Sequence, residues 1–167
     1  MSEELHCLPL PYSLAHRPGV PRSTERRGHW ATVRGVTRSN RASIALPTDP
    51  DDYVNPDMIV LPTAWMQDDD WLADPEDAVL AVEVISPAEK SREIRDKADW
   101  YAVARVPVLL VIDPRKGTWA LHTRPDNGAY RDVLPGKFGE AVRLPQPLGI
   151  EIATDGFPTY CPPPAPV

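Results

Sequence analysis

Three charged side chains in the middle of the chain could together hydrolyse a phosphodiester bond. Glu83 interrupts an apolar run at 78–85, and a carboxylate taken out of water is costly unless a cation or a metal ion pairs with it. Asp57 follows Pro56 at the start of a second apolar run, and Lys97 lies further along. Magnesium takes hard oxygen ligands such as carboxylates and carbonyls. A lysine beside them could orient water or neutralise charge on phosphate.

Each of these residues also has a purely structural explanation. Glu83 could be a buried carboxylate satisfied by Lys97 or by an arginine, and spacing alone favours neither interpretation. An Asp after a Pro is more often a turn residue, so Asp57 is weak evidence without Glu83. Glu93, Lys97 and Tyr101 are spaced i, i+4, i+8 and share one helix face. On an isolated helix, however, a solvated Glu–Lys pair is the commoner arrangement.

Other catalytic patterns are missing from the sequence. The histidines are scattered without metal-ligand spacing: His6, His16, His29 and His122. Cys7 and Cys161 lie in the two terminal segments and indicate neither a disulfide framework nor zinc. There is no Gly-rich phosphate loop and no G-x-S-x-G elbow. Ser86, which stands directly before a proline, is more typical of a cap or turn than of a nucleophile.

A strand, a helix and a second strand are needed to bring the charged residues together. The run 78–85 predicts a strand buried on both faces, and 108–112 predicts another. Residues 91–104 predict a helix with Ser91 as N-cap and with Ile94, Ala98, Tyr101 and Ala102 facing inward. The order predicts a right-handed βαβ unit with parallel strands. Glu83 then lies near the carboxyl end of its strand, where open α/β sheets usually place ligand sites.

Further elements extend this unit. Two prolines bracket a short strand at 57–61, a weaker strand is expected at 42–46, and 63–77 is expected to be a long acidic loop. Alternating strands at 118–123 and 130–134 flank the turn sequence Asp126-Asn127-Gly128 and predict a β-hairpin. A last strand is expected near 141–144. Together these elements predict a mixed α/β sheet.

Length and composition predict one domain in a soluble, cytoplasmic protein that does not contact a membrane. The chain has 167 residues, is 42% hydrophobic and carries a net charge of −6. The first 45 residues hold seven arginines against three acidic residues, but a basic segment without periodicity is more often solvated than a DNA-contacting arm. We therefore expect a flexible basic segment at 1–40, a folded domain at 41–160 and a Pro-rich tail at 161–167.

Several motifs in this order resemble a known family. They are Pro56-Asp57, the segment Val82 to Pro87 (Val-Glu-Val-Ile-Ser-Pro), Lys97, Tyr101, Val106-Pro107 and the segment Val111 to Pro114 (Val-Ile-Asp-Pro). Over roughly residues 41–160 the chain is similar to the Uma-two family, also called domain of unknown function 820. This bacterial group of proposed restriction endonucleases belongs to the PD-(D/E)XK superfamily. The resemblance implies a restriction-endonuclease-like α/β (α+β mixed-sheet) fold with a central βαβ unit and an added β-hairpin.

The resemblance also implies a site. Asp57 and Glu83 would be the metal ligands, with the backbone carbonyl of Val84 as the third, and magnesium the cofactor, for which manganese could substitute. DNA would be the substrate. The superfamily lysine usually stands two residues after the acidic ligand, where this chain has Ile85, and the family pattern places it on the next helix, at Lys97. Glu93 and Tyr101 would support these residues.

Three departures from the family pattern keep a second interpretation open. Glu93 stands where an Asp is usual, and Arg105 stands where a Gly usually ends the helix. The helices that normally begin the domain do not show in residues 1–40. The chain could therefore be a catalytically degenerate member that binds nucleic acid or protein without cutting. A homodimer would suit an active enzyme, because cutting both DNA strands needs two sites.

Overall fold

The structure, a computed structural model, describes residues 36–39, 42–46, 49–67 and 72–160, which all lie in the unit Trp30–Tyr160. Most of the expected flexible segment and the whole Pro-rich tail lie outside the described residues. The elements are β1 (Val36–Ser39), β2 (Ser43–Leu46), β3 (Asp49–Val54), β4 (Met58–Pro62), the 3-10 helix η1 (Thr63–Gln67), β5 (Leu72–Ala73), β6 (Leu80–Val84), α1 (Ser91–Val103), β7 (Val108–Asp113), β8 (Thr118–Asp126), β9 (Ala129–Lys137), β10 (Val142–Arg143) and β11 (Glu151–Ile152).

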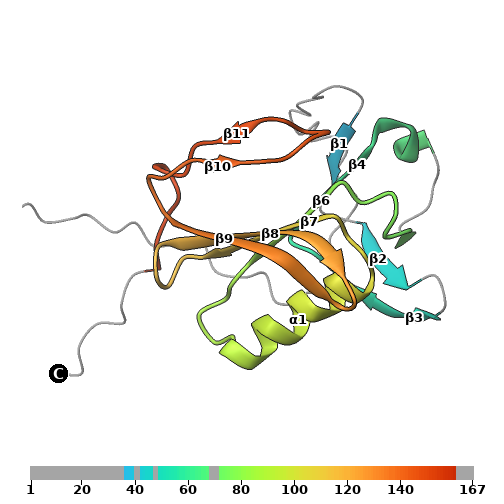
Figure 1. The fold of residues 1–167 in the computed structure, drawn as a ribbon, viewed down its shortest axis with the longest axis horizontal. Coiled ribbons are helices and arrows are strands. Elements are labelled where there is room, and N and C mark those ends of the chain that lie inside the picture. Colours follow the sequence, from blue (N-terminus) through green and yellow to red (C-terminus); the bar gives the residue numbers. More distant parts are fainter. Residues whose placement is uncertain (1–35, 40–41, 47–48, 68–71, 161–167) are drawn as a thin grey trace, which may run out of the picture. The chain divides into compact units, whose positions relative to one another are not determined.

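A six-stranded mixed sheet with the order β1-β4-β6-β7-β8-β9 organises the described residues (Figure 1). Strands β6 and β7 are parallel and are connected through α1, which confirms the predicted βαβ unit. All other neighbours in this sheet are antiparallel. Two smaller sheets, β3-β2-β5 and β10-β11, accompany it. The mixed α/β fold expected from the sequence is therefore present.

The central strands are apolar because both of their faces are covered. Ala81 and Ile85 belong to a core cluster on the side of α1, against which Ile94 and Ala98 pack as part of the expected inward stripe. Alternate residues of β6 point to a second cluster, which contains Val142 of β10. Figure 1 shows α1 and the β10-β11 pair on opposite sides of β8 and β9. A carboxylate on the α1 side of β6 must therefore be satisfied within the protein.

The β8–β9 hairpin forms where the turn sequence predicts it. Asn127 and Gly128 have φ values of 50° and 77°, and two consecutive positive φ angles are the requirement of a type I′ turn. Asp126 pairs with Ala129 across this turn. The hairpin is longer than expected, since β9 continues to Lys137 and forms an edge of the large sheet.

Several short elements were not anticipated. Strand β1 precedes the expected start of the domain and pairs with β4, so β4 is an internal strand. The expectation of one long acidic loop at 63–77 was wrong at two places, where η1 and β5 occur. Strand β3 also went unrecognised, because its sequence Asp-Pro-Asp-Asp-Tyr-Val has no apolar alternation. Pairing with neighbours, rather than local pattern, makes these segments strands.

The ends of α1 differ in how they are capped. Lys90, not the expected Ser91, is the N-cap, because Ser91 already has helical geometry. At the other end Arg105 has a positive φ of 63°, while Val106 N donates to Tyr101 O at 3.0 Å and Arg105 N donates to Ala102 O at 3.1 Å. This pair of bonds defines a Schellman motif, whose left-handed position normally holds Gly. None of the helices in the described ranges is long and apolar enough to cross a membrane.

Candidate active site

Glu83 receives two hydrogen bonds from one face of α1. Tyr101 donates its hydroxyl hydrogen to Glu83 Oε1 at 2.6 Å, and Lys97 Nζ lies 2.9 Å from Glu83 Oε2. Lys97 and Tyr101 are one helical turn apart, so both side chains can reach the same strand residue. The parallel β6–β7 pairing and the α1 crossover place this helix face over the end of β6. The predicted meeting of Glu83 with Lys97 and Tyr101 is present.

These contacts offset the burial of the carboxylate. Glu83 is only 4% exposed, and an unpaired charge at this depth would destabilise the fold. Burial, followed by the negative charge of Glu83, raises the pKa of Tyr101, which stays a protonated donor. Burial alone would lower the pKa of Lys97, but the hydrogen bonds to Glu83 and Glu89 outweigh it and raise this pKa. Lys97 therefore stays a cation.

Lys97 also contacts a second carboxylate, Glu89, which was not predicted from the sequence. Lys97 Nζ lies 3.0 Å from Glu89 Oε1, and the Glu89 side chain is 10% exposed. Glu89 Oε2 also accepts the backbone N–H of Ser86 at 3.2 Å. Burial would raise the pKa of Glu89, yet the bonds from Lys97 and Ser86 lower it. The sequence held a signal for the bond from Ser86 alone, because Ser86 and Glu89 have the S-x-x-E spacing of a capping box.

Asp57 lies beside Glu83 along the backbone rather than in direct contact with its side chain. Met58 pairs with Val82 in the antiparallel β4–β6 register. Asp57, just before β4, therefore lies near the end of β6, and its Oδ2 accepts the backbone N–H of Val84 at 2.7 Å. The Asp57 side chain is exposed, unlike that of Glu83. The structure thus brings two carboxylates to one end of β6, one in water and one in the core.

Glu93 is placed elsewhere, although it shares a helix face with Lys97. Its Oε2 accepts the backbone N–H of Lys90 at 3.0 Å, and the residue is exposed. This bond satisfies one of the free N–H groups at the start of α1. Glu93 therefore helps to begin the helix and does not contact Glu83.

The donor types at the end of β6 fit a magnesium ion that takes its remaining ligands from outside the protein. Among the residues with described placement, no group of three or more His, Cys, Asp and Glu side chains is arranged to hold a metal. Magnesium, however, commonly takes one or two protein carboxylates and keeps several waters. An ionised carboxylate has about four acceptor positions, and Glu83 uses two of them. Asp57 and Glu83 therefore retain capacity for a further partner.

Comparisons with known proteins identify a family and a fold for this chain. A family model, Uma2, described as "Putative restriction endonuclease", matches residues 25–155. No curated protein matches the chain. Among solved structures, the chain is similar to the crystal structure of a putative nuclease belonging to DUF820 from Anabaena variabilis ATCC 29413. That match has a TM-score of 0.55 and 13% identity, and it covers 73% of this chain and 67% of the other.

The structural likeness confirms the fold, and the family model covers most of the chain. Both agree with the resemblance expected from the motifs around Asp57, Glu83 and Lys97. The protein belongs to the Uma2 (DUF820) family of restriction-endonuclease-like proteins.

Proposed function

We propose that this protein is a magnesium-dependent DNA endonuclease that hydrolyses phosphodiester bonds. The observation that carries the proposal is the buried Glu83 held by Lys97 and Tyr101, one residue from the Val84 N–H that binds Asp57. Carboxylates can hold a magnesium ion that activates water, and an adjacent lysine can stabilise the charge that develops on phosphate.

Asp57, Glu83 and the backbone carbonyl of Val84 would hold the magnesium ion, with manganese as a substitute. Bound there, the ion would supply an acidified water and polarise the phosphate. The protein's own task is to hold the carboxylates in place. Tyr101 does this for Glu83 by donating its hydroxyl hydrogen to Oε1 at 2.6 Å.

Lys97 acts by charge in this proposal and not as a base. An ammonium group has three N–H donors, of which Glu83 and Glu89 take two in the described structure. The side chain is 43% exposed, so the third donor can reach water or a phosphate oxygen. Because its pKa is raised, Lys97 stays protonated and stabilises negative charge that develops on the phosphate.

Cleavage of supercoiled plasmid tests the proposal. Purified protein is incubated with magnesium, with manganese or with EDTA, beside Glu83→Gln, Lys97→Ala and the control Arg143→Ala, whose side chain is 85% exposed. We expect metal-dependent nicking that Glu83→Gln and Lys97→Ala lose by a factor of about 100 or more, while the control retains it. Circular dichroism verifies that each variant folds. Nicking that survives in folded Glu83→Gln would refute the assignment.

The same gel tests the proposed homodimer. A dimer with two sites should produce linear plasmid early, because both strands are cut in one encounter. A monomer should accumulate nicked circles first. A sedimentation measurement at the assay concentration then checks the mass directly.

One observation favours a second function, a module that binds DNA or protein without cutting. Both oxygens of Glu83 accept protein donors, and the residue is almost fully buried. A carboxylate satisfied in this way can be purely structural. The expected result for this alternative is DNA retention in a gel shift, with no metal-dependent cleavage in the plasmid assay.

A further inference from the structure

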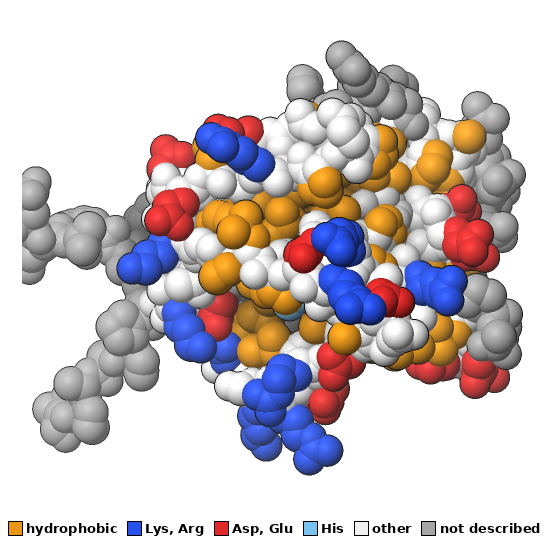
Figure 2. All heavy atoms as spheres, viewed as in Figure 1, with side chains coloured by type: hydrophobic (Ala, Val, Ile, Leu, Met, Phe, Trp, Pro, Cys, Tyr) orange, Lys and Arg blue, Asp and Glu red, His pale blue; other side chains and the backbone are white. Residues whose placement is uncertain are grey.

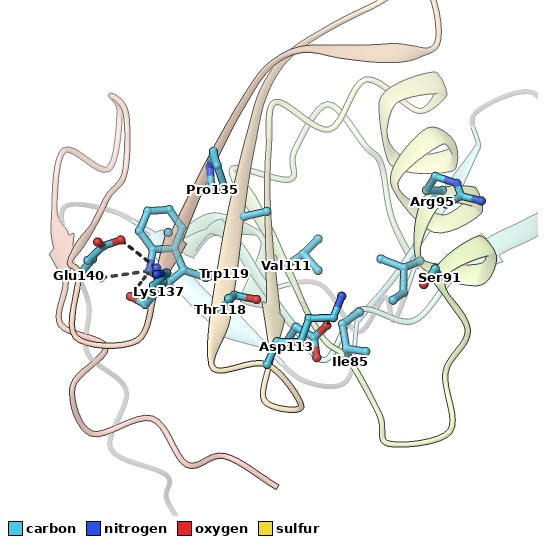
Figure 3. Close-up of a pocket in the computed structure, with 14 residues that line it drawn as sticks. Ile85, Ser91, Arg95, Val111, Asp113, Thr118, Trp119, Pro135, Lys137 and Glu140 are labelled. Carbon is cyan, nitrogen blue, oxygen red and sulfur yellow. Dashed lines mark hydrogen bonds and ion pairs between the residues drawn. The ribbon is translucent and has the colours of Figure 1, made fainter.

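A pocket of about 600 Å³ opens between α1 and strands β7, β8 and β9 (Figure 3). Its apolar lining consists of Ile85, Ile94, Val111, Trp119, Ala120 and Pro135. None of Asp57, Glu83 and Lys97 lines it. From α1 the residues Ser91, Ile94 and Arg95 lie on its wall. The pocket is separate from the candidate active site and has the size of a small-ligand site.

Cations surround this apolar lining. Arg95, Lys116 and Lys137 all line the pocket, and Figure 2 shows Lys and Arg side chains around an apolar hollow below β9. In Figure 3, Arg95 lies on α1 at one side and Lys137 on β9 at the other. Arg95 and Lys137 make no side-chain ion pair or hydrogen bond within the described ranges.

The two acidic residues of the lining do not cancel these charges. Asp113 is bound by Arg115, with Nε and Nη2 each 2.8 Å from a carboxylate oxygen. Glu140 Oε2 accepts the backbone N–H of Lys137 but has no cationic side-chain partner in the part of the chain that the structure describes. Lys116 Nζ also lies 3.9 Å from Asp113, so among the described residues two lining cations without a carboxylate partner, Arg95 and Lys137, face one carboxylate that is not already paired. This excess of positive charge is confined to the pocket, since the whole chain has a net charge of −6.

We propose that this pocket takes one unpaired nucleotide of a DNA strand, with the base against the apolar lining and the phosphates at the cationic rim. An inorganic anion would leave the apolar lining unused, and a neutral apolar ligand would leave the cations unused. Paired bases are held inside a duplex and cannot enter. A groove that combines positive charge with surfaces for bases is the general design for binding single strands.

The proposal rests on the proposed nuclease function and narrows its substrate. Ile85 of the lining follows Glu83 by two residues on the same face, which is a distance of roughly 7 Å along a strand. A DNA strand cut at the end of β6 can therefore extend into the pocket. The preferred substrate is then DNA with an unpaired segment beside the cleaved bond.

Binding measured in EDTA tests the pocket without any cleavage. Fluorescence anisotropy of the full chain compares a labelled single-stranded oligonucleotide with a blunt duplex of the same length, and unlabelled deoxynucleoside monophosphate serves as competitor. Lys137→Ala removes a cation of the rim. Ala120→Phe fills the pocket without a change of charge. Arg143→Ala is the control, because it removes an exposed cation of β10 (85% exposed) that does not line the pocket.

We expect tighter binding of the single strand and a loss of roughly fivefold to tenfold in Lys137→Ala and Ala120→Phe, but not in Arg143→Ala. The two phosphates that flank one nucleotide predict a slope of about −1.4 for log affinity against log salt, and Lys137→Ala should reduce the size of this slope by about 0.7. Equal affinity for duplex and single strand, or equal losses in Lys137→Ala and Arg143→Ala, would overturn the proposal. So would a monophosphate that competes as well as the oligonucleotide, since the site would then take free nucleotides.

The two proposals can fail separately. Single-strand binding that depends on Lys137, together with no metal-dependent nicking, would refute the nuclease and leave the nucleotide pocket standing. Nicking that is lost in Glu83→Gln, together with single-strand binding that is unchanged in Lys137→Ala, would refute the nucleotide pocket alone. A thermal melt of Ala120→Phe shows whether that variant is folded, and Lys137→Ala decides the outcome if it is not.

Discussion

Replacing Lys97 by methionine should destabilise the fold, because it removes the cation that pairs with Glu83 and keeps most of the apolar stem. Glu83 has a side-chain exposure of 5% and keeps one partner, Tyr101. Glu89, 10% exposed, loses its cation as well and keeps the backbone N–H of Ser86. Two largely buried carboxylates would then be left undercompensated.

The size of the effect follows from this burial. Removing one partner of a fully buried ion pair costs about 3–5 kcal/mol. The Lys97 side chain is 43% exposed, so water screens part of the interaction, and we expect a loss of about 2 kcal/mol. For a chain of this size that corresponds to a decrease in melting temperature of roughly 4–8 °C.

Urea and thermal denaturation at pH 7 measure this change. The matched control is Lys116→Met, since Lys116 lies 3.9 Å from Asp113 and is 67% exposed, and its loss should be close to zero. Adding Glu83→Gln to Lys97→Met should recover part of the stability, because a neutral amide replaces the unpaired charge. A Lys97→Met variant within about 0.5 kcal/mol of the wild type would refute the reasoning, since Glu83 could not then depend on Lys97.

Three further changes have defined outcomes. Arg105→Gly should raise stability by about 0.5–1 kcal/mol, measured by urea denaturation, because glycine suits a φ of 63°. An unchanged urea midpoint would show that the backbone of Arg105 is not strained. Gly136→Ala should lower stability by about 2 kcal/mol, since its Cβ would overlap the ring of Trp119, and a neutral thermal shift would show that the ring can move. Hydrogen bonds from Arg115 lower the pKa of Asp113 from its ordinary value of 3.8. The stability from this pair is therefore complete above that value and disappears as pH falls through the lower, folded-state pKa. Asp113→Asn should reduce the melting temperature at pH 7 and make it depend less on pH in the acid range. The same pH dependence of the melting temperature in wild type and variant would argue against a stabilising Asp113–Arg115 pair.

The sequence was sufficient for the parts of the site that depend on short-range pattern. The apolar run around Glu83 predicts a buried strand, and the spacing of Lys97 and Tyr101 places both on one helix face. The βαβ order predicts that this face covers the strand, because a parallel connection must return across the sheet. These features depend on periodicity and on the order of neighbouring elements, which can be seen in one sequence. The family motifs also occur in a defined order along the chain, so the resemblance is visible in the sequence alone.

The remaining features depend on contacts between distant parts of the chain, which only the tertiary structure decided. The bond from Val84 N–H to Asp57 needs the register of β4 against β6, and no local pattern specifies a register between strands that are distant in sequence. Glu89 reaches Lys97 only because the turn after Ser86 folds back. Glu93, by contrast, is held at the start of α1 by a backbone N–H. The sequence determined which side chains could do chemistry, and the geometry of strand pairing and turns decided which of them meet.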